Sequence, residues 1–231
     1  TLLAGYGVVM ALLAGAGLGL LIGIANGLLV ASLGLPSIIV TLGTLSIVRG
    51  AALLLGGPDL HAIRDQAAYS AIGAGNLAGV PVPVIIFLVL AALVWFLQAR
   101  TPFGTMVAAV GDNERAAWLS GLNVAAIKAA TYGLCGVLAA IAGMIQSAQV
   151  YTASATYGKF GTELDVIAAV VLGGTQLSGG VGSVARTLLG VLFLGILNNG
   201  MNILNVSIDI QLIAKGIIIA LALSLAARRA G

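Results

Sequence analysis

The stretch LLAGYGVVMALLAGAGLGLLIGIANGLLVAS, residues 2–32, contains no charged side chain. An α-helix needs about 20 apolar residues to cross the hydrocarbon core of a bilayer, and this run is longer. Its apolar residues are continuous, whereas the strands of a membrane barrel alternate apolar and polar positions over about ten residues. The stretch therefore predicts a transmembrane helix.

The composition of the whole chain extends this prediction. Hydrophobic residues make up 60% of the chain and charged residues only 7%, which is too little charge for a water-exposed surface. Many of the 33 glycines stand at small-xxx-small spacings, which allow close backbone approach between helices in lipid. We predict an all-α fold, a polytopic transmembrane helical bundle.

Hydropathy, together with Gly, Pro and charge breaks, predicts one transmembrane domain over residues 1–231 with about seven spans. The span at 163–178 is short and runs into two glycines, so a broken or re-entrant helix stays open for it. No charged segment precedes the first apolar run, and we expect the chain to lack its N-terminal portion. The predicted spans are 4–31, 36–56, 83–99, 126–149, 163–178, 184–205 and 209–227.

The basic residues predict the orientation, because cytoplasmic loops hold the excess of Lys and Arg. A cytoplasmic loop at 100–128 puts six basic residues inside and two outside, provided that 163–178 crosses the membrane fully. The C-terminus is then cytoplasmic. The inside residues are Arg100, Arg115, Lys128, Arg186, Arg228 and Arg229, and the outside residues are Arg64 and Lys159.

Several classes of function are disfavoured. The Lys and Arg are scattered, which argues against a nucleic-acid partner. One histidine, His61, and one cysteine, Cys135, make a metal centre or a histidine-dependent triad improbable, and no GxxxxGK[ST] loop for ATP is present. We therefore expect no catalytic residue, metal or cofactor in this chain. The polar external loop 57–82 is either a docking surface or a solvated connection.

The most informative segment is RTPFGTMVAAVGDNERAAWLSGLNVAAIK, residues 100–128. We predict a short helix from about Glu114 to Ser120, with Asp112 or Asn113 as its N-cap and Gly121 ending it in a left-handed conformation. Such a helix either packs into a groove of a partner protein or lies at the membrane interface, anchored by Trp118.

Polar side chains within apolar spans are costly in lipid and call for a role. We assign a translocation path to a small set of them, while interhelical hydrogen bonds, or helix capping for the two acidic residues after Thr162, stay open as alternatives. The partners of Arg49 and Lys215 are not identified by the sequence. The predicted path residues are Asn26, Gln146, Glu163, Asp165, Asn198 and Asn202.

The segment GGTQLSGGVGSV, residues 173–184, is rich in glycine. Irregular backbone at membrane depth is tolerated only where protein buries it or where it faces a water-filled path. We predict a gate or hinge there, formed by Gly173, Gly174, Gly179, Gly180 and Gly182.

Five further stretches join residues 100–128 in resembling the ribose-type permease family, which is related to the branched-chain amino-acid permeases. They are NGLLVASLGLPSIIVTLGTLSIVRGAALLL (26–55), YGLCGVLAAIAGMIQSA (132–148), GTELDVIAAVVLGGTQLSGGVGSV (161–184), TLLGVLFLGILNNGMNIL (187–204) and KGIIIALAL (215–223). The resemblance implies the permease subunit of a bacterial ATP-binding-cassette sugar importer in the inner membrane.

The same resemblance implies the partners. They are a second permease subunit, identical or not, a cytoplasmic ATPase that carries ATP and Mg²⁺, and a periplasmic sugar-binding protein. It also implies that the cytoplasmic segment is a coupling helix entering a cleft of the ATPase, with the coupling residues Asp112, Asn113, Glu114, Ala116, Ala117, Ser120 and Gly121. The alternatives are a branched-chain amino-acid permease and an energy-independent channel or membrane scaffold.

Overall fold

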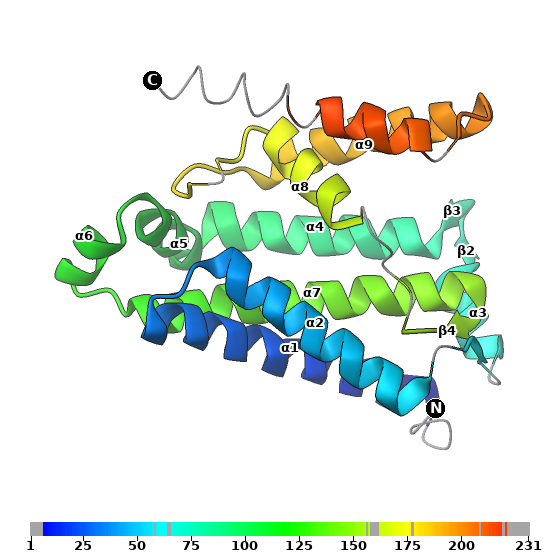
Figure 1. Cartoon of the computed structure of the whole chain (residues 1–231), viewed down its shortest axis with the longest axis horizontal. Helices are drawn as coiled ribbons and strands as arrows, with labels where there is room; N and C mark the ends of the chain where they lie inside the picture. Colours follow the sequence, from blue (N-terminus) through cyan, green and yellow to red (C-terminus); the bar gives the residue numbers. More distant parts are fainter. Residues whose placement is uncertain are drawn as a thin grey trace. The chain divides into compact units, whose positions relative to one another are not determined.

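The computed structural model describes residues 7–57, 59–63, 66–155, 157, 162–176, 178–207, 209–218 and 220. Almost all of its regular structure is helical, as the sequence predicts, and the remainder is two short strand pairs (Figure 1). Four of the basic residues used to predict the orientation lie outside the described residues. They are Arg64, Lys159, Arg228 and Arg229.

Within the described part of the chain, five helices are long and apolar enough to cross a membrane, and each lies over one of the seven predicted spans. They are α1 (Gly7–Leu33), α2 (Ser37–Gly56), α4 (Val82–Arg100), α7 (Val124–Val150) and α9 (Val184–Ile203). Of the predicted span 209–227, residues 209–218 are helical and residues 221–227 lie outside the described part of the chain.

The predicted span 163–178 is helical only in α8 (Thr162–Leu172), which has 11 residues. At 1.5 Å per residue this helix is about 16 Å long, roughly half of the hydrocarbon thickness. The helix ends at Leu172, and it is followed by Gly173 and by Gly174, whose φ is +75°. Alpha8 therefore does not cross a bilayer by itself, and a full crossing would have to use the non-helical residues that follow it.

The chain folds as two compact units. The first unit contains residues 1–90 and 122–157, and the second contains residues 91–121 and 158–231, so that α4 passes from one unit into the other. Each unit is therefore built from two segments that are distant in sequence, and neither unit is a continuous stretch of the chain.

In the first unit, α1 packs antiparallel against α7, and glycines form the contact (Figure 1). A Cβ placed on Gly27 would lie 2.6 Å from Ala129 Cα, and a Cβ on Gly19 or Gly23 would meet the backbone of Gly136 or Tyr132. The three α1 glycines are four residues apart and share one helix face. This arrangement confirms the close helix packing that the small-xxx-small spacings predict.

The predicted external loop 57–82 has structure of its own. Strand β1 (His61–Ala62) pairs antiparallel with β4 (Thr152–Ala153), and β2 (Asn76–Leu77) forms a hairpin with β3 (Val80–Pro81). Between β1 and β2 along the chain lies α3 (Gln66–Gly73), which contacts α7. The loop is therefore folded onto the end of α7 within the first unit.

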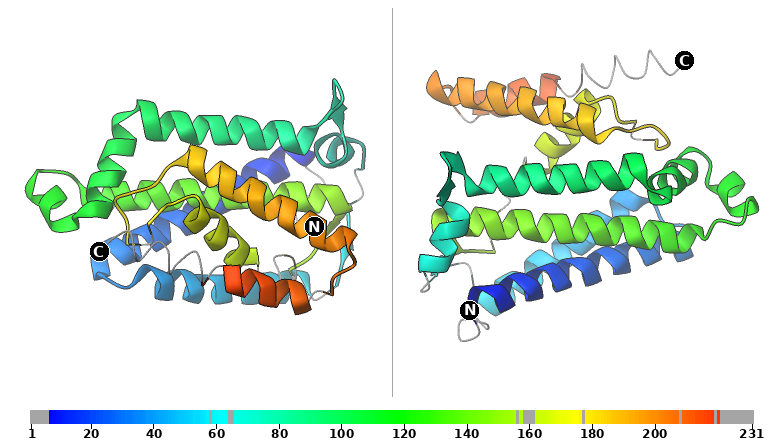
Figure 2. Two further views of the ribbon diagram at one scale, coloured as in Figure 1. Left: turned by 90° about the horizontal axis from the view of Figure 1, so that it is seen from above. Right: turned by 180° about the vertical axis from the view of Figure 1, so that it is seen from behind.

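The second unit contains α5 (Pro102–Asp112), α6 (Glu114–Leu119), α8 and α9. Figure 2 shows the yellow-green α8 lying against the orange α9. A Cβ on Gly173 would lie 2.7 Å from Thr187 Cα, and one on Gly190 would overlap the carbonyl of Ala169, so the helices pack antiparallel and very closely. Ala168, Ala169 and Leu194 form the buried centre of this contact.

Candidate functional site

The segment that follows α4 turns back sharply because two residues permit it. Pro102 occupies the first turn of α5, where its missing N–H is not needed for a helical hydrogen bond. A Cβ on Gly104 would overlap the carbonyl of Gln98, so only glycine allows this approach of α5 to the end of α4. The turn carries α5 and α6 away from the end of the apolar helix (Figure 1).

Alpha6 has the boundaries and caps that the sequence predicts. Of the two cap candidates, the structure uses Asn113, whose Oδ1 accepts a hydrogen bond of 2.9 Å from the N–H of Ala116. Asp112 is instead the last residue of α5. Gly121 follows the helix with a φ of +86°, a left-handed conformation that favours glycine. Short-range chemistry thus defines this six-residue helix at both ends.

The side chains of α6 are almost all accessible. Ala117 is 5% exposed and faces inward, whereas Trp118 and Leu119 are 60% and 68% exposed. The guanidinium of Arg115 lies over the Trp118 ring at 5.7 Å from its centroid. The other predicted coupling residues are exposed, namely Asp112, Asn113, Glu114, Ala116, Ser120 and Gly121. The helix therefore presents two large apolar side chains beside charged ones, a composition suited to a protein partner.

The predicted gate glycines follow α8, and two of them, Gly179 and Gly180, pack against the end of α5. Three of them have left-handed φ values, +75° at Gly174, +98° at Gly179 and +76° at Gly180. A Cβ on Gly180 would lie 3.0 Å from Asp112 Cα, and one on Gly111 would lie 2.6 Å from the N of Gly180. The loop and the end of α5 are thus in backbone contact, which sequence patterns alone did not reveal.

Gln98 is a residue of this site that the sequence analysis missed. Its Nε2 donates to the carbonyl of Gly182 at 3.1 Å, and its Oε1 accepts from the N–H of Val184 at 2.9 Å. Both groups of the amide are therefore bound to the segment that leads into α9. The available signal was that α4, VPVIIFLVLAALVWFLQAR, contains a single amide side chain.

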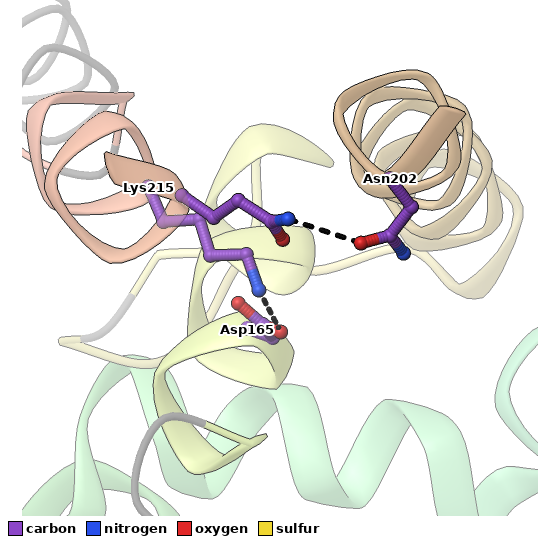
Figure 3. Close-up of polar contacts among 4 residues, drawn as sticks. Asp165, Asn202 and Lys215 are labelled. Carbon is purple, nitrogen blue, oxygen red and sulfur yellow. Dashed lines mark hydrogen bonds and ion pairs between the residues drawn. The ribbon is translucent and has the colours of Figure 1, made fainter. Parts of the chain in front are cut away.

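A polar cluster lies at the opposite end of α9, in the same unit (Figure 3). Lys215, in the helix 209–218, forms an ion pair of 2.8 Å with Asp165 of α8, and their side chains are 17% and 29% exposed. Gln211, which is 9% exposed, donates from Nε2 to Asn202 Oδ1 at 3.0 Å and to the carbonyl of Val206 at 2.9 Å. These contacts join three helices, and they identify the partner of Lys215 that the sequence left open.

The remaining predicted path residues have separate surroundings. Asn26 is 9% exposed and its Oδ1 accepts a hydrogen bond from Thr44, which joins α1 to α2. Gln146 is exposed on α7, and Glu163 is exposed in the first turn of α8. Asn198 Oδ1 is buried and has no hydrogen-bond partner among the described residues. Asn26 and Gln146 belong to the first unit, and the other path residues belong to the second.

Metal ligands are sparse in the described ranges. Within them, no group of three or more His, Cys, Asp or Glu side chains is close enough to hold a metal ion.

The family profile described as "Branched-chain amino acid transport system / permease component" matches residues 1–223. The chain is 42% identical over 201 residues to the ribose import permease protein of Bacillus subtilis, covering 87% of this chain and 62% of that protein. It is 42% identical over 216 residues to the ribose import permease protein of Escherichia coli, covering 92% of this chain and 67% of that protein.

The L-arabinose transport system permease protein of Escherichia coli is 38% identical over 84% of this chain and 58% of its own length. The chain thus spans about two thirds or less of the length of these relatives. No solved structure matches it significantly. Together with the five apolar helices, the permease relatives identify a multi-pass membrane protein.

Proposed function

This chain belongs to the permease-component family of branched-chain amino acid transport systems, and from that membership we propose that it is the membrane-spanning subunit of an ATP-driven sugar importer. The names of the ribose and arabinose relatives support a monosaccharide as the substrate. The observation that carries the proposal is α6, a short helix that is fixed at both ends yet leaves Trp118 and Leu119 exposed.

In this proposal α6 docks into a groove of a cytoplasmic ATPase. Its exposed residues Trp118 and Leu119 supply apolar contact, and Glu114 and Arg115 supply charge at the rim. ATP and Mg²⁺ bind to the ATPase, and the permease contributes movement rather than covalent chemistry. The coupling residues are the predicted set, Asp112, Asn113, Glu114, Ala116, Ala117, Ser120 and Gly121.

The assembly follows from the same hypothesis. Two permease subunits, identical or different, pair in the bacterial inner membrane, and a periplasmic sugar-binding protein docks on the outer side. The C-terminus and the loop 100–128 lie in the cytoplasm. The folded loop 57–82, which has its own hairpin at β2–β3, then faces the binding protein.

Translocation proceeds by alternating access, in which closure of the ATPase moves α6 and opens a central path. Amide side chains suit an uncharged polyol because they donate and accept hydrogen bonds without a fixed charge. Of the predicted path residues, Asn198 and Asn202 lie on α9, and the Oδ1 of Asn198 is buried without a hydrogen-bond partner among the described residues. Asp165 is already paired with Lys215, so its carboxylate reaches a sugar only if that ion pair opens. The remaining path residues are Asn26, Gln146 and Glu163.

A second candidate is a branched-chain amino-acid permease, because the matching family profile carries that description. The two candidates differ in the solute that is transported and in the binding protein that delivers it, and they share the same α6 and a cytoplasmic ATPase. Competition experiments therefore separate them directly.

The test is uptake by the permease reconstituted in vesicles with its ATPase and binding protein. We expect ATP-dependent uptake of ribose that excess pentose reduces and excess leucine does not. Replacing Glu114 with Ala or Gly121 with Val should uncouple ATP hydrolysis from uptake while membrane insertion stays intact. If ATP has no effect on solute flux and no ATPase co-purifies, the importer hypothesis is wrong.

A further inference from the structure

The loop between α8 and α9, residues 173–183, is held at both of its sides within the second unit. On one side, Gly179 and Gly180 lie against the backbone of Gly111 and Asp112 at the end of α5. On the other side, the amide of Gln98 binds the carbonyl of Gly182 and the N–H of Val184. The loop is therefore fastened to both helices that precede α6.

The loop also has an internal shape that makes it follow its neighbours. The N–H of Gln176 donates to the carbonyl of Val181 at 3.0 Å, and the N–H of Gly179 donates to the carbonyl of Gln176 at 3.2 Å. These bonds join Gln176 to both Gly179 and Val181 across a turn that contains left-handed glycines. The two sides of the loop should therefore move together. A shift of Asp112 towards Gly180 would push against the loop backbone, because a Cβ added to Gly180 would lie only 3.0 Å from Asp112 Cα.

Movement of the loop would be passed on along α9. Val184 is the first residue of α9, and a helix of 20 residues is about 30 Å long and behaves as a rigid rod over that distance. Gly190 packs against the Ala169 carbonyl of α8, which fastens the two helices together. The far end of α9 contains Asn198 and Asn202, so the contacts connect the end of α5, two residues before α6 begins, to the polar cluster in one unit.

We propose that loop 173–183 relays the movement of α6 to the α8–α9 pair, and that Gln98 is the positioning residue that holds the loop in register with α4 and α9. The inference rests on the proposed function, since it presumes that α6 is moved by an ATPase. It assigns a coupling role to a side chain that lies outside α6 and touches neither the ATPase nor the sugar. It treats the loop as a firm link, an alternative to the gate or hinge predicted for these glycines.

The experiment compares three variants of the full importer in vesicles, with ribose as the probe. Gln98→Met keeps the side-chain length and removes both hydrogen bonds, whereas Gln98→Glu keeps an acceptor for the N–H of Val184. The matched control is Thr105→Val, because the Thr105 hydroxyl donates to the carbonyl of Pro102 within α5 and, among the described residues, does not bind the loop. The readouts are ribose moved per ATP hydrolysed and co-purification of the ATPase.

We expect Gln98→Met, which removes both hydrogen bonds, to lower the ribose moved per ATP about five-fold or more, since one net hydrogen bond alone corresponds to about a five-fold change. The ribose moved per ATP by Gln98→Glu should lie between the values for Gln98→Met and the native protein. Thr105→Val should have the native value, and the ATPase should co-purify with all three variants. An unchanged ratio in both Gln98 variants overturns the relay; if Gln98→Met fails to assemble, Gln98→Glu decides alone. If the native permease binds no ATPase, the proposed function fails and the relay fails with it.

Discussion

Glycines at helix contacts show how single residues determine the packing of this protein. Lipid is as apolar as the helices, so helix association in a membrane depends on close contact rather than on removing apolar surface from water. At Gly27 the α7 backbone comes so close that even a methyl group has no room, whereas Gly17, on the same helix, has no atom within 4 Å of its added Cβ. Glycine is therefore required at some positions of α1 and merely tolerated at others.

A pair of identical substitutions tests this difference. Gly27→Ala should destabilise the protein by about 1–3 kcal/mol, because the added Cβ would lie 2.6 Å from Ala129 Cα. Gly17→Ala, the control, should be neutral or slightly stabilising, since it improves helix propensity without a clash. Thermal unfolding in detergent measures both. Equal unfolding midpoints for the two variants would contradict the proposed α1–α7 contact.

The Asp165–Lys215 ion pair is the second feature at this scale. Removing one partner leaves the other charge in a partly buried, low-dielectric position, so Lys215→Met should cost about 1.5–3 kcal/mol of stability. Replacing both residues, as in Lys215→Met with Asp165→Leu, should recover most of that loss. The control is Glu163→Gln, since Glu163 is exposed in the same turn. A double-mutant cycle on thermal midpoints checks the pair, and a coupling near zero would argue against it.

At the scale of elements, α6 is unusual because caps rather than packing define it. A helix of six residues is far below the length that is stable alone in water, and only Ala117 is buried. Asn113 and Gly121 therefore contribute a large share of its order. The long helix α7 has the same kind of cap, with Asn123 Oδ1 accepting from the N–H of Ala126 at 3.0 Å, but packing against α1 stabilises it as well.

The two caps provide a matched comparison. Each Asn→Ala change removes about 1 kcal/mol of helix stability. We expect Asn113→Ala to weaken ATPase binding about five-fold without lowering the thermal midpoint, because α6 is peripheral to the packed helices. Asn123→Ala should lower the midpoint slightly and leave ATPase affinity unchanged. Binding titrations and thermal unfolding distinguish these outcomes, and the reverse pattern would show that α6 is not the docking element.

For the whole molecule, α4 determines which surfaces face opposite sides of the membrane. It is 19 residues long and uncharged up to Arg100, which is long and apolar enough to cross a bilayer once. The folded loop 57–82 and the α5–α6 segment leave α4 at its two ends. The binding protein and the ATPase of the proposed importer therefore have separate surfaces, and the basic residues favour the α6 side as cytoplasmic.

Cysteine labelling tests this arrangement. In a chain with Cys135→Ala, we expect Leu77→Cys to react with an impermeant maleimide in right-side-out vesicles, and Ser120→Cys to react only after the membrane is opened. Leu77 is 66% exposed and Ser120 is also exposed, so both positions are accessible to the reagent. Labelling of both from the same side would rule out α4 as a transmembrane crossing.

The sequence by itself determined the features that depend on local chemistry. Continuous apolar runs predicted the membrane helices, and an Asn and a Gly at helical spacing predicted both ends of α6. These predictions succeeded because hydropathy and capping act over a few neighbouring residues. The seven-span topology, the orientation, the coupling residues and the path residues remain predictions.

Only the tertiary structure decided which distant residues meet. Gln98 binds residues more than 80 positions away, Asp165 pairs with Lys215, and the glycine loop lies against the end of α5. The gate or hinge at the glycine loop also stays a prediction, and what the structure adds is that Gly179 and Gly180, lacking side chains, allow close backbone contact with Gly111 and Asp112. Such contacts depend on how helices pack across the chain, and no local pattern around Gln98, Asp165 or Gly180 encodes its partner.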